Sequence, residues 1–427
     1  MMRFIGSSFA KTRIAASTMT KTLTFLLLSV ATTKALLVPP APTTTTPLRL
    51  DTTDYRALLL NDAPMMDVRA PVEYEKGSFP SAHNFPLMMD DERHEVGICY
   101  KQKGQDAAIA LGNQLVCGPV KKERMELWTN FAKAHPSDGY LYCFRGGLRS
   151  NTVQQWIEQE TGVRVPLVTG GYKAMRQFLL DELDRSLAPE RTDVILICGP
   201  TGSGKTRVVL DIPETSVDLE GLAHHRGSSF GRWPEDPEQL SQIDFENSLS
   251  IGLLKLLDTF EKSGTKRKAS VFLEDEGTRI GKVTVPVVLR ERMAVCQGAV
   301  IVEESVEERV NVIMEDYIFD LGRRYAVLYG SAQGMEEHSG YLLAGLARCR
   351  RRLGGERQDQ LSSIMSSAFA EQAATGDTSL HRVWIESLLV DYYDPMYQYQ
   401  LEQRSVERKV LFCGNRDAVT EYCKAYA

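Results

Sequence analysis

Short apolar runs alternate along the chain with longer stretches in which apolar and polar residues follow a helical period. In the first half, "DYRALLL" at residues 54–60 predicts a short helix, an apolar strand ends at Asp67, and another strand covers Tyr140–Tyr142. A helix is expected to follow this second strand, with Ser150 as its N-cap. The run "VRVPLVTGGYKAM" at 163–175 predicts a third strand that leads into a further helix. Strands that alternate with helices favour a parallel α/β sheet.

The second half begins with a continuous apolar run, "DVILIC" at residues 193–198, which is typical of a strand that is buried on both faces. Similar runs follow in "ASVFLEDE" at 269–276 and "GAVIVEES" at 298–305, and a shorter strand is expected to end at 218–220. Residues 306–404 have mainly helical patterns. The chain is therefore predicted to be an α/β protein in which a second parallel sheet carries a helical C-terminal part.

These patterns divide the chain of 427 residues into four segments. The segments are a targeting segment and linker at 1–50, a first α/β domain at 51–188, a second α/β domain at 189–305, and a helical part at 306–427 that packs on the second domain. A chain of this length is long enough for domains that each bury a core of their own.

The first segment has an unusual composition. Residues 1–50 contain six Lys or Arg residues and no Asp or Glu. The apolar run at 23–31 is too short to span a membrane comfortably, and the Pro and Thr residues at 38–47 disfavour a helix. This composition is typical of a targeting sequence, so we expect delivery to a plastid or mitochondrion and no stable membrane insertion after processing. A cytoplasmic protein with a disordered extension is the alternative.

Charge and cysteine content narrow the class of protein. The formal net charge is −6, so a nucleic-acid partner would have to dock on a local basic patch. One such group of arginines is "LARCRRRLG" at 346–354, which reads as a solvated helix face or as a contact to nucleic-acid phosphates. The eight cysteines are scattered, without C-x-x-C or zinc spacing, which indicates free thiols in a reducing compartment and no certain metal site.

The stretch "ICGPTGSGKTRVVL" at 197–210 contains the complete phosphate-binding motif G-x-x-x-x-G-K-[ST] between a predicted strand and a predicted helix. Its glycines let the backbone wrap a phosphate, its lysine supplies a cation, and its threonine is a candidate Mg²⁺ ligand. The acidic end of "ASVFLEDE" lies where ligands bind in open α/β sheets. The predicted phosphate-binding residues are Gly199, Gly202, Gly204, Lys205, Thr206, Glu274 and Asp275, with Thr206 as the position for Mg²⁺.

An anion-binding turn is also expected in the first domain. The stretches "DVRAPVEYEKGSFPSAHN" at 67–84 and "YCFRGGLRS" at 142–150 resemble the rhodanese family, in which a reactive cysteine lies in a loop at a helix N-terminus. The resemblance implies a rhodanese-like fold for this domain and catalytic roles for Cys143, Arg145 and Arg149. The Cys-x5-Arg spacing, however, is that of cysteine phosphatases, and Phe144 occupies the usual rhodanese cysteine position. A sulfurtransferase, a phosphatase and a buried structural cysteine all stay open.

A second thiol competes for the catalytic role. Cys99 lies in the polar stretch "DDERHEVGICYKQKGQDAAIALG" at 90–112, beside Tyr100 and Lys101. We expect this stretch to be exposed, and a neighbouring lysine lowers the pKa of a thiol. From the local sequence alone, an incidental loop cysteine is the alternative.

The motifs occur together in one known family. A domain with "ICYKQKGQDAAIALG", "YCFRGGLRS" and "LVTGGYKAMR", followed by "GPTGSGKT", "VDLEGLAHHRGSSFG" and "YYDPMYQYQ", resembles the tRNA 2-selenouridine synthase family from about residue 51 to near the C-terminus. The resemblance implies a transferase that acts on the wobble uridine of tRNA and replaces the sulfur of 2-thiouridine by selenium from selenophosphate. It also implies transfer of a geranyl group from geranyl diphosphate to that sulfur, which makes the sulfur a better leaving group.

The resemblance also implies roles for residues and partners. Cys99 matches the family's catalytic cysteine in G-x-C-Y-K-Q and is therefore preferred over Cys143, whose loop is expected to hold selenophosphate or the leaving phosphate. The phosphate loop would hold the diphosphate. The partners implied are a tRNA that carries 2-thiouridine and the enzyme that supplies selenophosphate. Further substrate-binding residues are expected in the second domain at Asp218, Glu220, Arg226 and Arg232.

Other functions are compatible with the residues themselves. An ATP- or GTP-dependent kinase would act at Lys205, and a rhodanese-type enzyme would use Cys143 as its nucleophile. A tRNA-binding adaptor would need neither of the two thiols.

Overall fold

The computed structural model describes residues 49–236, 238–265, 267–402 and 408–426. The predicted targeting segment lies almost entirely outside this described part of the chain. The described residues all belong to one compact unit.

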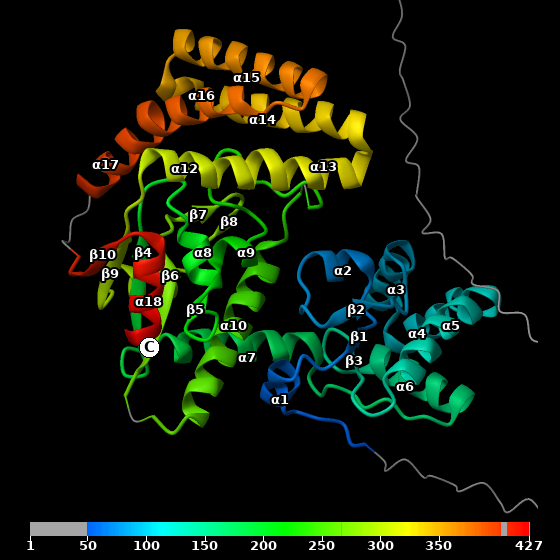
Figure 1. Cartoon of the computed structure of the whole chain (residues 1–427). Coiled ribbons are helices and arrows are strands. Elements are labelled where there is room, and N and C mark those ends of the chain that lie inside the picture. The colour runs from blue at the N-terminus through cyan, green and yellow to red at the C-terminus, as the bar shows by residue number, and fades with distance from the viewer. Residues whose placement is uncertain (1–48, 237, 266, 403–407, 427) are drawn as a thin grey trace, which may run out of the picture. The chain divides into compact units, whose positions relative to one another are not determined.

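The N-terminal domain is built on a short parallel sheet with the strand order β2-β1-β3 (Figure 1). Its strands are β1 (Met65–Asp67), β2 (Ala82–Asn84) and β3 (Tyr140–Tyr142). Met65 lies opposite Ala82 on one side and opposite Tyr140 on the other. The helices of this domain are α1 (Tyr55–Leu60), α2 (Pro71–Glu75), α3 (Asp90–Lys103), α4 (Gln105–Leu115), α5 (Gly118–Ala134), α6 (Leu148–Thr161) and α7 (Gly171–Ser186). The predicted parallel α/β order and the strands that end at Asp67 and Tyr142 are confirmed.

Two details predicted for this domain were wrong. Helix α6 begins at Leu148 with Gly147 as its N-cap, so Ser150 lies inside the helix and its hydroxyl donates to the Gly147 carbonyl at 2.9 Å. The predicted third strand is reduced to isolated bridges at Leu167 and Val168. Pro166 precedes these bridges and has no N–H to donate to a strand ladder.

The second sheet is parallel throughout and has the order β10-β9-β4-β6-β5. Its strands are β4 (Thr192–Cys198), β5 (Ser216–Val217), β6 (Ala269–Glu274), β9 (Gly298–Val302) and β10 (Val410–Gly414). The runs at 193–198, 269–276 and 298–305 thus form strands as predicted. The hydrophobic pattern did not predict β10, which brings the chain back from the C-terminal helices to the edge of this sheet.

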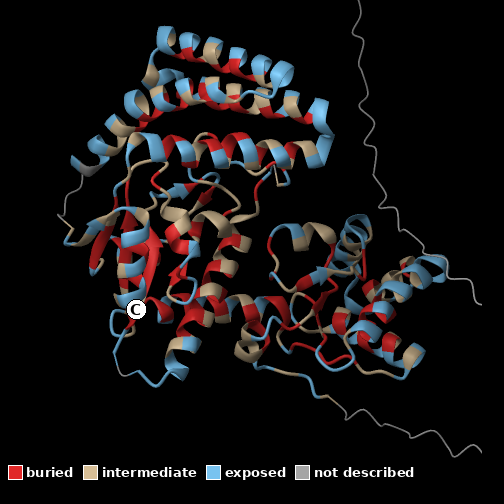
Figure 2. Cartoon of the chain, viewed as in Figure 1, coloured by how far each residue is buried: buried red, intermediate tan, exposed pale blue. Residues whose placement is uncertain are grey.

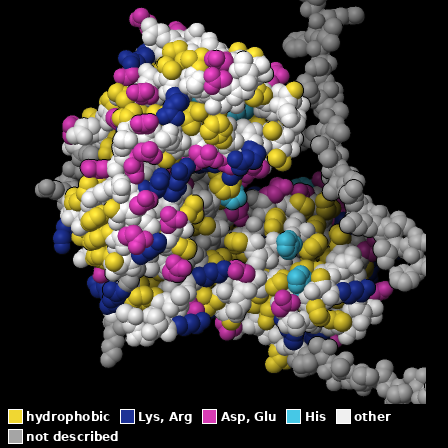
Figure 3. Space-filling model, viewed as in Figure 1, with side chains coloured by type: hydrophobic (Ala, Val, Ile, Leu, Met, Phe, Trp, Pro, Cys, Tyr) yellow, Lys and Arg dark blue, Asp and Glu magenta, His cyan; other side chains and the backbone are white. Residues whose placement is uncertain are grey.

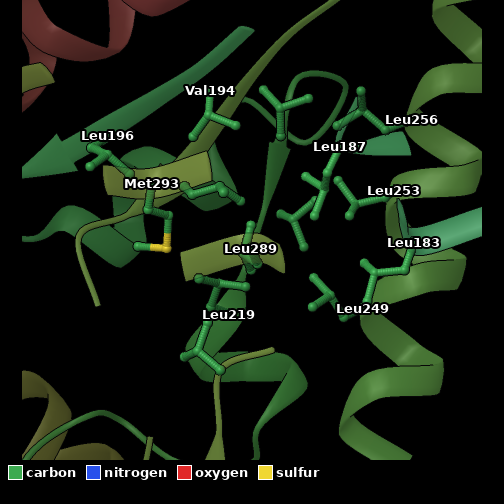
Figure 4. Close-up of a cluster of buried hydrophobic side chains, with 14 of the residues drawn as sticks. Leu183, Leu187, Val194, Leu196, Leu219, Leu249, Leu253, Leu256, Leu289 and Met293 are labelled. Carbon is green, nitrogen blue, oxygen red and sulfur yellow. The ribbon is translucent and has the colours of Figure 1, made fainter. Parts of the chain in front are cut away.

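The central strand β4 is buried on both faces, which explains its continuous apolar run. Val194 and Leu196 pack with side chains of α10 and α11 in one cluster (Figure 4), and Ile195 and Ile197 pack with side chains of α8 and α18 in another. The helices around this sheet are α8 (Lys205–Leu210), α9 (Leu219–Leu222), α10 (Gln242–Lys262), α11 (Val287–Ala294) and α18 (Arg416–Tyr426). A small antiparallel hairpin, β7 (Arg279–Ile280) and β8 (Val283–Thr284), lies between β6 and α11.

The predicted helical part between β9 and β10 is confirmed, and it includes two π-helical segments, η1 and η2. Its elements are α12 (Val306–Ile313), η1 (Met314–Asp320), α13 (Leu321–Tyr329), α14 (Ser331–Leu353), α15 (Gly355–Thr375), α16 (Ser379–Leu388), η2 (Leu389–Tyr393) and α17 (Asp394–Glu402). Buried and exposed positions alternate along these helices, so that each buries a stripe against its neighbours (Figure 2). None of the helices in the described ranges has both the length and the apolar character that crossing a membrane requires.

Helices α7 and α10 join the N-terminal domain to the second sheet. Met175 of α7 packs in a core cluster with Ile251 of α10, and Leu183, farther along α7, packs in the cluster around β4. Asp244 at the start of α10 accepts a hydrogen bond from the backbone N–H of Ser78 at 2.7 Å. The predicted boundary near residue 188 therefore falls after a helix that belongs to both cores.

Candidate functional site

The phosphate loop lies between β4 and α8, and its glycines are required by geometry. Gly199, Gly202 and Gly204 have φ angles of 150°, 80° and 84°, which side-chain-bearing residues rarely adopt. A Cβ on Gly199 would lie 2.6 Å from the carbonyl oxygen of Val302, and a Cβ on Gly202 would lie 3.0 Å from that of Arg309. The loop is therefore held closely between β9 and α12.

The two residues that start α8 have different partners. The Nζ atom of Lys205 donates to the carbonyl oxygen of Gly199 at 2.9 Å. The Oγ1 atom of Thr206 donates to Glu274 at 2.6 Å and lies 3.3 Å from a carboxyl oxygen of Glu220. The structure thus brings the predicted phosphate-binding residues Thr206 and Glu274 together, and adds Glu220, which was predicted separately as a substrate-binding residue.

The carboxyl groups near Thr206 lie close to one another, and Glu274 is buried while Asp218, Glu220 and Glu276 are half-buried. Burial, with the charge of Asp218, raises the pKa of Glu274 to about 8, although the hydrogen bond from Thr206 acts in the opposite direction. Burial, with the charges of Glu274 and Glu276, raises the pKa of Glu220 well above its usual value. This acidic group therefore favours either protons or a cation beside Thr206.

A cavity of about 920 Å³ opens at the phosphate loop. Figure 3 shows side chains of both charges gathered along the hollow below α12 and α13. The predicted residues that line this cavity, which we call the phosphate cavity, are Gly199, Gly202, Gly204, Lys205, Thr206, Asp218, Glu220, Arg226 and Asp275. Glu274 is buried behind this lining, and Arg232 lies outside it with an exposed side chain.

Two of the predicted residues are fixed at the cavity by ion pairs. Arg226 donates to the carboxylate of Asp320 at 2.6 Å. Asp275 accepts from the guanidinium of Arg408 at 2.7 Å. Each charge is therefore directed by a partner that lies far away in the sequence.

The helical C-terminal part supplies cavity residues that the sequence did not single out. The π-helical segments place Tyr317 and Tyr393 at the phosphate cavity, and α17 adds Met396 and Tyr397. Segments of π-helix are frequent at functional sites. The stretch "YYDPMYQYQ" was the available signal for three of these residues, although only as part of a family resemblance. Charged lining residues that were also missed are Arg207, Glu276, Arg279, Asp316, Arg324 and Arg408.

Arg309 ties the phosphate loop to the C-terminal helices. This buried side chain donates from Nε to the carbonyl oxygen of Thr201 at 2.9 Å, and from Nη1 to Asp394 at 3.0 Å. A second guanidinium nitrogen reaches the other oxygen of Asp394, so the pair is bidentate. Arg309 therefore orients the loop without lining the cavity.

A second candidate site lies in the N-terminal domain, where Cys143 follows β3. The backbone N–H of Tyr172 donates to the Cys143 carbonyl oxygen at 2.9 Å, and that of Lys173 donates to the Phe144 carbonyl oxygen at 2.9 Å. A Cβ on Gly171 would lie 2.3 Å from the Cys143 carbonyl oxygen. The start of α7 thus holds the Cys143 turn in place.

The surroundings of the Cys143 thiol stabilise its ionised form. Burial acts to raise the pKa of Cys143, but the hydrogen bond with Ser150, backbone N–H groups of the turn and the charge of Arg149 lower the pKa overall. The Sγ atom lies 3.3 Å from the Ser150 hydroxyl. Arg149 is fixed in turn by Glu73 at 2.6 Å. This is the electrostatic setting expected for a reactive thiol or an anion site.

A cavity of about 840 Å³, which we call the thiol cavity, opens at this turn and is lined by Cys143, Arg145 and Arg149. Cys99 does not line it. The stretch predicted to contain a loop cysteine is the helix α3, and Cys99 lies about 200° around that helix from Gly97, which does line the cavity. The structure therefore brings three predicted catalytic residues together and places Cys99 on the other side of α3; the catalytic role of Cys99 stays a prediction.

The arrangement of potential ligands limits which metal sites are possible. In the described ranges, no group of three or more His, Cys, Asp or Glu residues is placed so that it could hold a metal ion by itself. Thr206 and its carboxylate partners are nevertheless hard oxygen donors, the type that Mg²⁺ prefers.

Comparisons with known proteins give a consistent result. Residues 192–427 match the family model described as the tRNA 2-selenouridine synthase AAA domain. The tRNA 2-selenouridine synthase of Alcanivorax borkumensis is 50% identical over 375 residues, which cover 88% of this chain and 99% of the relative. That of Marinobacter nauticus is 49% identical over 377 residues, with 88% and 98% covered.

One solved structure also aligns with part of the chain. It is the N-terminal domain of a protein described as ATP/GTP binding from Clostridium difficile 630, and it is 34% identical over 27% of this chain and 88% of its own. Its TM-score of 0.24 is too low to support an argument about the fold. The full-length matches decide the matter: the chain belongs to the tRNA 2-selenouridine synthase family of selenium-transferring enzymes.

Proposed function

We propose that the chain replaces the sulfur of 2-thiouridine in tRNA by selenium from selenophosphate, and that its two cavities serve two successive steps. The observation that carries this proposal is the complete phosphate loop that lines one cavity, in a chain whose other cavity holds a buried thiol of lowered pKa. Both donors in the proposal are phosphorylated, which suits the two anion-binding settings.

The first step is geranylation of the sulfur in the phosphate cavity. The loop binds the diphosphate of geranyl diphosphate, the sulfur attacks C1 of the geranyl group, the C1–O bond breaks, and N3 of the base loses its proton. Lys205 and the N–H groups of the loop stabilise the charge that develops on the diphosphate as it leaves. The same cavity offers apolar surface to the geranyl chain, and this surface includes Ile313, Tyr393 and Met396.

Mg²⁺ fits this step. Thr206, with Glu220 and Glu274, would hold the ion, and phosphate oxygens of the substrate would complete its coordination. The ion would supply additional positive charge to the leaving diphosphate. The raised pKa of the two carboxyl groups gives a physical reason for a cation here, since a cation favours their ionised forms.

The second step is displacement of the alkylated sulfur in the thiol cavity. The selenium atom of selenophosphate attacks C2, the C2–S bond breaks, and geranyl thiolate leaves. One water molecule then supplies oxygen to the phosphate as the P–Se bond breaks, one proton to N3 and one to the thiolate. Selenium does not change its oxidation state. Arg145 and Arg149, with the N–H groups of the turn, bind the phosphate in this scheme.

Nucleoside mass spectrometry of thiolated tRNA tests the proposal. The purified wild-type protein is expected to form S-geranyl-2-thiouridine with geranyl diphosphate, and 2-selenouridine when selenophosphate is also present. Hydrolysis of ATP or GTP without either nucleoside would overturn the proposal in favour of the kinase alternative. Binding of the tRNA without any product would favour the adaptor.

A further inference from the structure

The thiol cavity has two kinds of wall. Its polar end contains Glu73, Arg93, Cys143, Arg145 and Arg149. Most of the remaining wall is apolar and comes from α3, α4, α6 and nearby loops, with Met88, Val96, Ile98, Ile109, Leu148 and Trp156 among its residues. Small inorganic anions need only the polar end.

The apolar wall includes large side chains that are open to solvent. Ile98, Tyr100 and Leu148 are 42%, 57% and 53% exposed, and all three line the thiol cavity. An exposed apolar surface beside a fixed anion site suits a ligand that carries both a charged and a hydrocarbon part.

Two glycines inside helices keep this cavity open. Gly97 lies in α3 and Gly112 in α4, and both line the cavity. A glycine inside a helix is unfavourable compared with alanine. Packing does not require either one, because a Cβ on Gly97 would meet nothing within 4 Å and a Cβ on Gly112 would meet only Val96 at 3.9 Å. The free space that these glycines leave calls for an explanation outside the protein's own core.

We propose that the thiol cavity binds the geranyl chain of the S-geranyl nucleoside along its apolar wall while C2 of the base lies at the Cys143 turn. This inference rests on the two-step function proposed above. The volume of about 840 Å³ leaves room for a ten-carbon chain together with a base and an anion. A 2-thiouridine whose sulfur carries no alkyl group would leave the apolar wall uncovered, and selenophosphate alone would touch only the polar end.

This arrangement gives the chain a role in specificity. Only sulfur that has already been alkylated gains the contact with the apolar wall, so the second step selects the product of the first. The same wall also binds the leaving group, because the geranyl chain stays on the sulfur when the C2–S bond breaks. The order of the two steps then follows from binding and needs no separate switch.

Binding of synthetic RNA tests the inference independently of the first reaction. Anticodon stem-loops that carry S-geranyl-2-thiouridine, S-methyl-2-thiouridine or 2-thiouridine are titrated by fluorescence anisotropy. For wild-type protein we expect the geranylated RNA to bind at least about tenfold more tightly than the methylated RNA, because each buried methylene group adds to the affinity. Equal affinity of the wild-type protein for the two alkylated RNAs would overturn the inference.

Matched variants locate the effect. Gly97→Leu is expected to abolish the preference for the geranylated RNA because the leucine fills the free space, whereas Gly97→Ala should retain most of it. Gly340→Leu is the control, because Gly340 is an exposed position inside α14 where a Cβ also meets nothing within 4 Å. Ile98→Ser removes apolar wall without filling the cavity and should reduce the preference as well.

The outcomes separate this inference from the function on which it rests. If both Gly97→Leu and Ile98→Ser keep the preference for the geranylated RNA, and their circular dichroism spectra show an unchanged fold, the geranyl chain binds elsewhere. This result would overturn the inference. If the wild-type protein binds the geranylated RNA preferentially, Gly97→Leu abolishes that preference, and no selenium-containing nucleoside forms, the proposed function fails and the inference that the thiol cavity binds the geranyl chain stands.

Discussion

Lys205 and Thr206 are neighbours in the sequence, yet the fold gives them different partners. The lysine lies along the carbonyl groups of the phosphate loop, and the threonine lies beside the buried carboxyl group of Glu274 and the half-buried one of Glu220. The motif alone supplies the chemical groups, whereas the charges around them come from Glu220 in α9 and Glu274 at the end of β6. Three predictions concern these residues and the two thiols.

Lys205→Ala is expected to reduce geranylation of thiolated tRNA by about 100-fold or more, because the leaving diphosphate loses its main cation. The rate of S-geranyl-2-thiouridine formation, measured by mass spectrometry, checks this. Lys424→Ala, at an exposed lysine on α18, is the control and should leave the rate unchanged. Undiminished geranyl transfer in Lys205→Ala would mean that the diphosphate binds elsewhere.

The raised pKa of Glu274 predicts a pH dependence of stability. A carboxyl group with a pKa of about 8 in the folded protein and 4.5 otherwise stabilises the fold fully below about pH 4.5, and this contribution is lost as the pH rises through 8. The melting temperature of the ligand-free protein should therefore fall by less between pH 5 and pH 8.5 in Glu274→Gln than in the wild type. Glu336→Gln, at an exposed position, serves as the control. Parallel pH profiles for wild type and Glu274→Gln would contradict the burial argument.

The two candidate thiols can be separated by mutation. Following the family resemblance, Cys99→Ser is expected to abolish selenium incorporation and to leave geranylation largely intact, while Cys143→Ser is milder. The direct displacement proposed above needs no protein nucleophile, so this prediction rests on the family resemblance alone and would add a thiolate to that step, which a hydroxyl cannot replace at neutral pH. Nucleoside mass spectrometry with both donors is the measurement, and Cys117→Ser, at an exposed cysteine of the same domain, is the control. Loss of selenium transfer in Cys143→Ser alone would reverse the roles and make the thiol cavity's own cysteine the reactive one.

At the scale of elements, the phosphate loop is shaped by the strand before it and by helices far along the chain. The glycines of the loop abut β9 and α12, and Arg309 of α12 links the loop to Asp394 at the start of α17. The helical C-terminal part therefore does more than cover the sheet: it fixes the loop's conformation and supplies one wall of the cavity.

Arg309→Lys tests this link. A lysine keeps the charge but cannot reach Thr201 and both oxygens of Asp394 at once, so we expect the free energy of unfolding to fall by roughly 1.5–3 kcal/mol. The KM for geranyl diphosphate should rise more than kcat falls, because the loop is mispositioned and the reacting groups are intact. Arg350→Lys, in the exposed pair with Asp359, is the control and should change neither quantity appreciably. If Arg309→Lys lowers stability and leaves KM unchanged, Arg309 is a structural residue only.

At the scale of the whole molecule, the two cavities belong to one compact unit whose cores share α7 and α10. One polypeptide thus carries both an alkylating and a selenium-transferring centre in the proposed function, and the tRNA base has to visit both. The acid-free N-terminal segment is not used in this scheme, and its role as a targeting sequence stays a prediction.

Deletion of residues 1–45 is expected to leave both reactions of the purified protein unchanged within about twofold. A fusion of the same residues to a fluorescent protein should enter a plastid or a mitochondrion, because their basic, acid-free composition is typical of transit sequences. Microscopy of the fusion checks this, with the fluorescent protein alone as the control. Diffuse cytosolic fluorescence would refute the targeting prediction.

The sequence by itself determined the features that are local in the chain. A continuous apolar run specifies β4 because both faces of that strand are buried, and the spacing of Gly199, Gly204 and Lys205 specifies a phosphate loop because backbone conformation and charge are set within a few residues. The combination of motifs was sufficient to identify the family. The Cys143 turn was likewise predicted from its position between a strand and a helix.

Only the tertiary structure decided which distant residues meet. The family resemblance favoured Cys99 over Cys143, but the helical rotation of α3 directs Cys99 away from the thiol cavity, whereas Cys143, after β3, lines that cavity. Nothing in the sequence indicated that Arg309 would pair with Asp394 or that β10 would return to the sheet. Nor did it indicate that Tyr317 and Tyr393 would meet at one cavity. Such contacts depend on how helices pack over long sequence separations, and local patterns of apolar and polar residues carry no record of which surfaces face one another.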